Sequence, residues 1–178
     1  FLSPSKVAES VLDEKKPPKE GKRVMVEFSS PNTNKPLHLG HLRNIFLGES
    51  VSRVGEYKGN KVIRSCLVND RGTHICKSML MYKRHGEKEP DTKSDHFVGK
   101  FYVKYNEEAK DNPNLEKEAQ DMLKKWESGD PETVALWKKM NAWAEQGFQE
   151  TYSELGISFD RIYHESEIYK GGKEMVLF

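Results

Sequence analysis

The sequence of 178 residues predicts an α/β fold, in which a parallel β-sheet is interrupted by a charged helical insertion. Three observations support this prediction. Two short runs of strand-forming residues, 24–28 and 61–68, enclose a stretch whose apolar residues recur at helical spacing. A highly charged stretch, also with helical spacing, follows them, and a third strand-like run comes after it. Because a strand, a helix and a second strand in succession form a right-handed βαβ unit, we expect the sheet to be parallel.

The overall composition excludes several classes of protein. With 29 Lys and Arg against 28 Asp and Glu, the net charge is +1, which gives no broad basic surface for nucleic acid. No apolar run approaches the roughly 20 residues that a membrane span needs, so we expect no membrane partner. The first residues do not resemble a secretory signal, and Cys66 and Cys76 are too few for a disulfide framework. We therefore expect a protein of the reducing cytoplasm.

The chain begins with a segment whose sequence is typical of a linker. Residues 1–23 contain Pro17-Pro18 and show no sustained apolar periodicity, although a short helix over 5–13 is compatible with the pattern. The folded part begins at Val24 with a buried strand over 24–28. A loop rich in Ser, Pro, Asn and Thr occupies 29–37. Apolar residues at helical spacing follow and predict a helix that stops at Gly55 or Gly59: Leu42, Ile45, Phe46, Leu47, Val51 and Val54.

The sequence predicts a second strand at 61–68 and a helix at 73–84. Together with the first strand and helix they form a βαβ half of the fold over 24–85. The composition changes after this segment. Between 83 and 127, 10 basic and 11 acidic residues make 21 of 45 positions charged. Asp130-Pro131 opens the clearest helix, with an N-cap aspartate and a proline at the first helical position, and Gly156 suits its end. We interpret 86–156 as a helical insertion. The strand predicted at 157–163 returns the chain to the sheet, so that 157–178 is its truncated continuation.

The most informative segment runs from Glu27 to Arg43, EFSSPNTNKPLHLGHLR, and centres on an H-x-G-H sequence. It lies where the loop after the first strand becomes a helix, and open parallel sheets bind ligands beyond the carboxyl ends of their strands. The helix start offers N–H groups and a positive dipole end to a phosphate. His38 and His41, three residues apart, can both donate hydrogen bonds to phosphate oxygens, and Gly40 allows a base or ribose to approach the backbone. The segment therefore predicts a nucleotide site.

These residues carry a resemblance to a known family. H-x-G-H is the first signature of the class I aminoacyl-tRNA synthetases, and EFSSPN followed by KP and GHLR resembles the arginyl-tRNA synthetases more narrowly. The later stretch Asn69-Asp70-Arg71-Gly72-Thr73 is similar to that family's Gly-Asp-Trp-Gly-Thr/Lys sequence. Here Asn69 replaces the first glycine and Arg71 replaces the tryptophan.

The resemblance implies a Rossmann-type nucleotide-binding catalytic domain, of which this chain would hold the first half with its insertion. It implies that the arginine carboxylate attacks the α-phosphate of Mg-ATP, giving arginyl-adenylate and pyrophosphate, and that tRNA(Arg) then receives the arginyl group. The expected catalytic and ATP-binding residues are Lys35, His38, Gly40 and His41. The expected contacts to L-arginine are Glu27, Ser30, Asn32, His38 and Asp70. We expect no tightly bound protein metal and find no sign of a protein partner.

The family's second signature, a Lys-Met-Ser-Lys-Ser-type loop, and its Tyr-x-Thr-x-Asp stretch have no counterpart in this sequence. We therefore expect an excised fragment that is inactive alone. Two other interpretations stay open: another H-x-G-H synthetase or adenylyltransferase, and a non-catalytic nucleotide-binding module. At the residue level, Glu27 can face either the guanidinium or the amino-acid backbone, or form an ordinary ion pair. Lys35 can be an exposed loop lysine, and Asp70 can serve the loop turn rather than the substrate.

Overall fold

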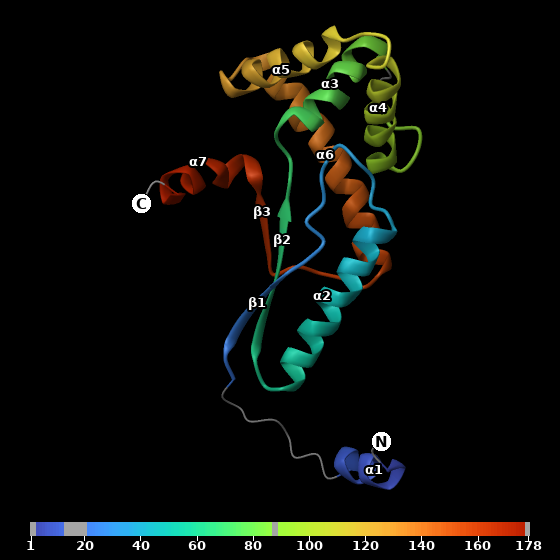
Figure 1. Cartoon of the computed structure of the whole chain (residues 1–178), viewed down its shortest axis with the longest axis vertical. Coiled ribbons are helices and arrows are strands. Elements are labelled where there is room, and N and C mark those ends of the chain that lie inside the picture. The colour runs from blue at the N-terminus through green and yellow to red at the C-terminus, as the bar shows by residue number, and fades with distance from the viewer. Residues whose placement is uncertain (1–2, 13–20, 87–88, 177–178) are drawn as a thin grey trace.

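The computed structural model of the chain describes residues 3–12, 21–86 and 89–176 and confirms the predicted α/β architecture (Figure 1). Three strands, β1 (Arg23–Glu27), β2 (Lys61–Val68) and β3 (Arg161–His164), form one sheet in the order β1-β2-β3. Both pairings are parallel, as the βαβ pattern predicts. Near the N-terminus, α1 (Pro4–Leu12) matches the short helix expected there, whereas Pro17-Pro18 lies outside the described residues.

Helix α2 (Leu39–Tyr57) covers one face of β1 and β2. Its contact with β1 is close, because a Cβ atom on Gly48 would lie 2.3 Å from the Phe28 ring. The helix buries Ile45, Gly48 and Ser52. Of the other apolar residues whose spacing predicts it, Leu42 is partly buried against the core, and four are more than half exposed: Phe46, Leu47, Val51 and Val54. The spacing identifies the helix correctly, but the buried side of α2 includes a small residue and a polar one beside Ile45.

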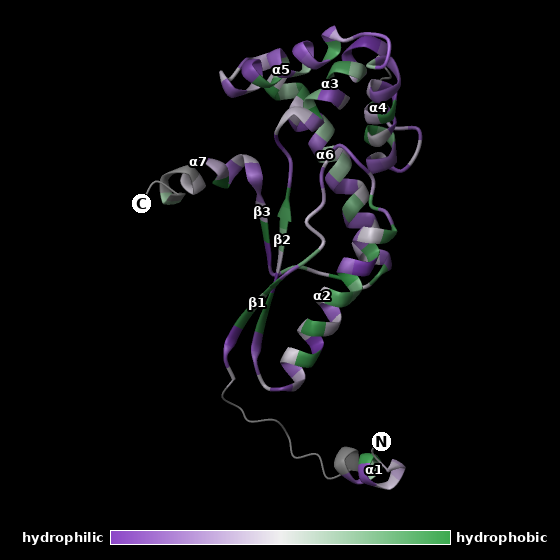
Figure 2. Ribbon diagram, in the orientation of Figure 1, coloured by the Kyte–Doolittle hydropathy of each residue, from purple (hydrophilic) through white to green (hydrophobic). Residues whose placement is uncertain are grey.

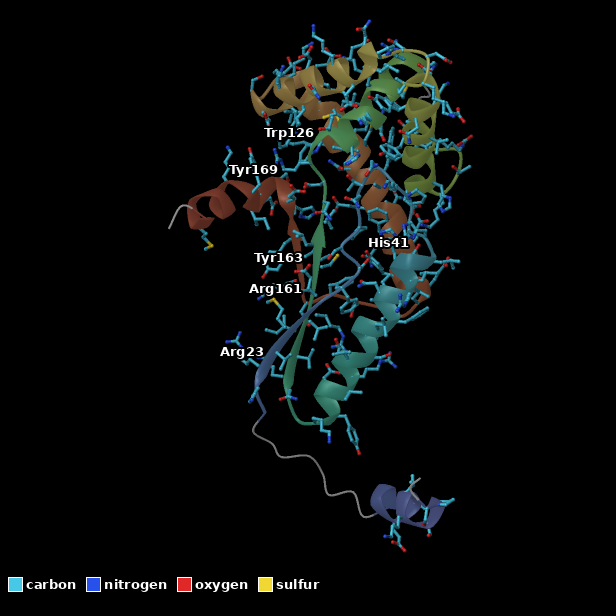
Figure 3. The ribbon with its side chains drawn as sticks, viewed as in Figure 1. Arg23, His41, Trp126, Arg161, Tyr163 and Tyr169 are labelled. Atoms are coloured by element: carbon cyan, nitrogen blue, oxygen red, sulfur yellow. The ribbon has the colours of Figure 1, made fainter. Side chains whose placement is uncertain are left out.

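The opposite face of the sheet carries basic and aromatic side chains. Along a strand, alternate residues point to opposite faces. Because Arg64 of β2 bonds to Glu49 and Glu56 of α2, its side chain points toward α2, and Ser65 and Leu67 of β2 point away. The register of β2 with β1 and β3 then assigns the faces of those strands. Arg23, Arg161 and Tyr163 lie on the side away from α2 (Figure 3).

Within the described residues, the charged region forms helices of which three gather beyond the carboxyl ends of the strands, while the fourth and longest runs back beside the end of the sheet (Figure 1). They are α3 (Thr73–His85), α4 (Ser94–Glu108), α5 (Asn114–Glu127) and α6 (Pro131–Glu154). The predicted start of α6 is confirmed: Pro131 is its first residue, and the Thr133 N–H donates to Asp130 Oδ2 at 2.9 Å. Figure 2 shows hydrophilic ribbon along much of these helices, in agreement with the charge count.

One hydrophobic core joins the sheet to the insertion. It runs from Phe28 and Ile45 through Met79 of α3 to Phe97 of α4 and Phe148 of α6, all of them almost fully buried. Trp137 and Trp143 of α6 are partly buried and pack against this core. The helices therefore do not form a separate body, and they support the end of the sheet where the loops lie.

The end of the chain differs from the sequence prediction. The third strand begins at Arg161 rather than at residue 157, because Ile157 is buried and the Phe159 ring packs on Phe28, 4.9 Å between centroids. Two apolar side chains two residues apart are typical of a strand, but here Ile157 and Phe159 belong to the segment that precedes β3. Beyond β3 the chain forms helix α7 (Glu165–Val176), which the sequence analysis did not predict.

Candidate nucleotide-binding site

The loop after β1 is strained and held in place from two sides. Ser29 and Ser30 have φ values of 70° and 44°, in the left-handed region that side chains other than glycine avoid. The Ser29 N–H donates to Asn44 Oδ1 at 2.6 Å, and the Ser29 and Tyr152 hydroxyls are hydrogen-bonded at 2.6 Å. Asn44 belongs to α2 and Tyr152 to α6, so these helices jointly impose the loop conformation.

Loop residues expected to contact arginine lie at the carboxyl edge of the sheet. Glu27 is the last residue of β1, and the Ser30 hydroxyl donates to Glu27 Oε1 at 3.2 Å. Asn32 is exposed and forms an isolated parallel bridge with Asn69. The loops after β1 and β2 are thus side by side, although they are 36 or more residues apart in sequence.

The two histidines form a reciprocal cap at the start of α2. His38 is the N-cap, and its Nδ1 accepts from the Gly40 N–H at 3.1 Å. His41 Nδ1 accepts from the His38 N–H at 3.2 Å, and the ring centroids are 4.0 Å apart. Because both Nδ1 atoms are acceptors, a neutral ring carries its proton on Nε2. The pair therefore presents two Nε2–H donors, although His38 precedes the first helical turn instead of lying in it.

Gly40 lies against the His38 ring of the cap. A Cβ atom at this position would lie 2.9 Å from Cε1 and 3.1 Å from Nδ1 of His38. The glycine therefore makes room for the histidine cap itself. Its N–H is already bonded to His38 and is not free for a phosphate oxygen.

The electrostatic surroundings keep His41 neutral. Partial burial lowers the pKa of His41, and the neighbouring His38 and Lys35 lower the pKa further. The neutral form is the one that accepts at Nδ1 and donates at Nε2. Lys35 is exposed, and its ammonium lies 5.4 Å from the centroid of the Tyr102 ring on α4. The structure thus brings Lys35, His38, Gly40 and His41 into one region.

Asp70 is occupied by structural contacts. It is 2% exposed, and its two carboxylate oxygens accept from the backbone N–H and the hydroxyl of Ser166, at 2.8 and 2.6 Å. Its carbonyl oxygen accepts from Trp137 Nε1 and Asn141 Nδ2. Asp70 thereby joins the loop after β2 to α6 and to the start of α7, and it lines a cavity of about 270 Å³ between them.

Several residues that shape this edge of the sheet were missed by sequence reasoning. Asn44 and Tyr152 hold Ser29, and Tyr102 contacts Lys35. Arg71, at the family's tryptophan position, has its guanidinium 3.9 Å from the Tyr169 ring and pairs with Glu127 at 3.0 Å. The Arg71 guanidinium also lies 5.8 Å from the centroid of the Trp126 ring, and Figure 3 labels Trp126 above Tyr169. Only Asn44 lies near enough to the H-x-G-H sequence to have been considered.

Other kinds of site have no support in the part of the chain that is described. Across residues 3–12, 21–86 and 89–176, no group of three or more His, Cys, Asp or Glu could hold a metal ion. None of the helices described is both long and apolar enough to cross a membrane. Burial raises the pKa of the Cys66 thiol to about 11 and that of Cys76 to about 12, so both stay protonated and unreactive at neutral pH.

A parallel sheet whose first crossover helix opens with H-x-G-H is typical of the nucleotide-binding fold of the class I aminoacyl-tRNA synthetases. The family model described as "tRNA synthetases class I (R), catalytic domain" matches residues 5–176. The chain therefore belongs to the arginyl-tRNA synthetase family of class I catalytic domains.

Individual relatives agree with this family. The arginine–tRNA ligase of Borrelia turicatae is 57% identical over 162 residues, covering 89% of this chain and 28% of the relative. That of Treponema denticola is 50% identical over 192 residues, covering 99% of this chain and 32% of the relative. Among solved structures, the Thermus thermophilus arginyl-tRNA synthetase matches 96% of this chain and 28% of its own, with 27% identity and a TM-score of 0.74. The chain thus spans about three-tenths of the length of these relatives.

Proposed function

We propose that this chain supplies the first half of the active site of an arginine–tRNA ligase, which activates L-arginine with Mg-ATP and transfers it to tRNA(Arg). The observation that carries the proposal is the reciprocal histidine cap, because it uses the Nδ1 atoms of both rings and so assigns the ring proton to Nε2 at the carboxyl edge of a parallel sheet. The arginine–tRNA ligases among the relatives support arginine as the amino acid.

The proposed first step needs positioning more than a protein nucleophile. A carboxylate oxygen of arginine attacks the α-phosphorus of ATP, the bond to the bridging oxygen breaks, and pyrophosphate leaves with its electron pair. His38 and His41 donate Nε2–H hydrogen bonds to phosphate oxygens as charge develops on them. Lys35 supplies a positive charge for the pyrophosphate. The tRNA 3′ end then attacks the arginyl carbonyl and releases AMP.

Arginine recognition in this proposal uses the loop after β1. The Glu27 carboxylate binds a cationic group of the substrate, the guanidinium or the α-amino group, through a charge-assisted hydrogen bond. Ser30, Asn32 and His38 bind the remaining polar groups of the amino acid. We assign Asp70 an indirect role, because both of its carboxylate oxygens already bond to Ser166.

The proposal also covers the organisation and setting of the chain. We keep the division into a linker (1–23), a βαβ half (24–85), a helical insertion (86–156) and a return to the sheet (157–178), with α7 now included in the last. ATP, L-arginine and tRNA(Arg) are its proposed partners, and the cytoplasm its proposed location.

A chimera tests the proposal. In it, this chain replaces the matching 162 residues of the Borrelia turicatae ligase. We expect arginine-dependent ATP–pyrophosphate exchange, and we expect His38→Ala and His41→Ala each to lower the rate about 100-fold, the loss seen when one preorganised donor is removed. Tyr57→Leu, at the far end of α2, serves as the control. A folded chimera no more active than these histidine variants would favour a non-catalytic module.

A further inference from the structure

We propose that Tyr102, on helix α4 of the insertion, is a positioning residue that holds the Lys35 ammonium at the nucleotide site. The inference rests on the proposed function and names a residue beyond the H-x-G-H region. The Lys35 Nζ atom lies 5.4 Å from the centroid of the Tyr102 ring, within the distance at which a ring face attracts a cation. Nothing in the sequence pattern connects these residues, which are 67 positions apart.

The Tyr102 ring contacts α3, and the helix that carries the ring contacts the lysine loop. Its hydroxyl is hydrogen-bonded to His74 Nδ1 of α3 at 3.1 Å, and the two rings meet edge to face. About one helical turn before Tyr102 on α4, Gly99 lies against the loop after β1. A Cβ atom at Gly99 would lie 2.6 Å from Pro36 Cδ. Since Pro36 adjoins Lys35, α4 is in contact with the lysine loop along its backbone as well as through the ring.

The contact with Tyr102 keeps the Lys35 ammonium near the two histidines. Lys35 is one of the charges that act on His41, so its ammonium already lies within electrostatic reach of the imidazole pair. A phosphate that binds the Nε2–H donors then meets a lysine confined to the same region instead of one sampling the solvent. Because an exposed lysine loses rotamer freedom when it binds, prior confinement lowers the entropic cost of phosphate binding.

The first measurement locates the lysine in the free chain. Protons above an aromatic ring resonate upfield, so the Lys35 ε-methylene signal in a ¹³C-lysine-labelled chain should lie upfield of exposed lysines. We expect this shift in the wild type and in Tyr102→Phe, which keeps the ring, and its loss in Tyr102→Leu. The control is Tyr57→Leu, the same change at an exposed tyrosine at the C-terminal end of α2, far from Lys35 in the fold. This variant should keep the upfield shift of the Lys35 signal. Unchanged Lys35 signals in Tyr102→Leu would overturn the proposal.

The second measurement tests whether the contact between Lys35 and Tyr102 strengthens ATP binding. We expect Tyr102→Leu to weaken ATP binding by about two- to fivefold, the range of a surface cation–π contact, and Tyr102→Phe to bind as the wild type does. In a Lys35→Ala background, Tyr102→Leu should cause no further loss, because the ring acts only through the lysine. An equal loss in both backgrounds would show a merely structural role and overturn the proposal. A chimera of this chain with the Borrelia turicatae ligase that binds no ATP would instead overturn the proposed function, on which this inference rests.

Discussion

At the scale of single residues, the histidine signature serves two purposes with the two nitrogens of each ring. The Nδ1 atoms of His38 and His41 complete the backbone hydrogen bonding at the start of α2, where helices otherwise leave N–H groups unpaired. In the proposed function, the Nε2–H groups bind the phosphate oxygens of the ligand. Substitutions that separate these two purposes therefore test the site directly.

His38→Asn and His38→Ala make this separation. Asparagine is a good N-cap, so we expect His38→Asn to keep the stability of the chain, whereas His38→Ala should lower the free energy of unfolding by about 1 kcal/mol. Both variants lack the Nε2–H donor and should bind ATP equally poorly. Urea unfolding and ATP titration provide the two measurements. ATP binding by His38→Asn at the wild-type level would contradict the role assigned to Nε2.

The pKa of His41 gives a pH prediction. Its value in the folded chain is lowered by burial and by His38 and Lys35, below the ordinary value of about 6.5. The unfolded chain therefore binds more protons at this group as the pH falls through 6.5, and the folded state loses stability until the folded pKa is passed. Titration by ¹H–¹⁵N NMR should place the His41 midpoint below 6.5. A midpoint at or above 6.5 would contradict this environment.

At the scale of elements, the loop after β1 depends on α6. Tyr152, near the end of that helix, is 5% exposed, and its hydroxyl bonds to the strained Ser29. We expect Tyr152→Phe to lower the free energy of unfolding by about 1–2 kcal/mol, because the buried Ser29 hydroxyl loses its partner. Tyr163→Phe, at a partly exposed tyrosine on β3, is the matched control and should be close to neutral. Equal stability of both variants would show that α6 does not hold the loop.

The contact between β2 and α2 is electrostatic at its centre. Arg64 donates to Glu49 at 2.8 Å and to Glu56 at 2.6 Å, and these hydrogen bonds lower the pKa of each carboxyl. The stabilisation is therefore present above the ordinary carboxyl pKa and is lost as the pH falls through the lowered folded values. We expect Arg64→Met to reduce stability at pH 7 and to flatten its decline in acid. Parallel stability curves for variant and wild type between pH 7 and 3 would contradict this.

At the scale of the whole molecule, sequence reasoning succeeded where the pattern is local. The βαβ unit, the start of α6 and the H-x-G-H loop are encoded within short segments. The partners of the loop are not, since Ser29 and Tyr152 are 123 positions apart and no short pattern joins them. Helix α7 was not predicted because Gly171 and Gly172 lower its helix propensity. The hydrogen bonds at its start come from Asp70, which lies in a loop distant in sequence.

The chain spans only about three-tenths of its relatives' length, and this limits what it can do alone. We expect it to bind ATP weakly and to show no arginine-dependent ATP–pyrophosphate exchange without the rest of a ligase. The comparison is between the purified chain and the chimera with the Borrelia turicatae ligase at equal concentration. Robust exchange by the chain alone would contradict this prediction.

The most direct test of the central claim follows the imidazole nitrogens while ATP is added to the ¹⁵N-histidine-labelled chain. The geometry of the cap predicts that the Nε2 signals of His38 and His41 move together on binding, while both Nδ1 signals keep the position of hydrogen-bond acceptors. His85, on α3, serves as the internal reference and should not respond. Movement of the Nδ1 signals, or ATP binding without any change at Nε2, would contradict the claim that this histidine cap is the phosphate site.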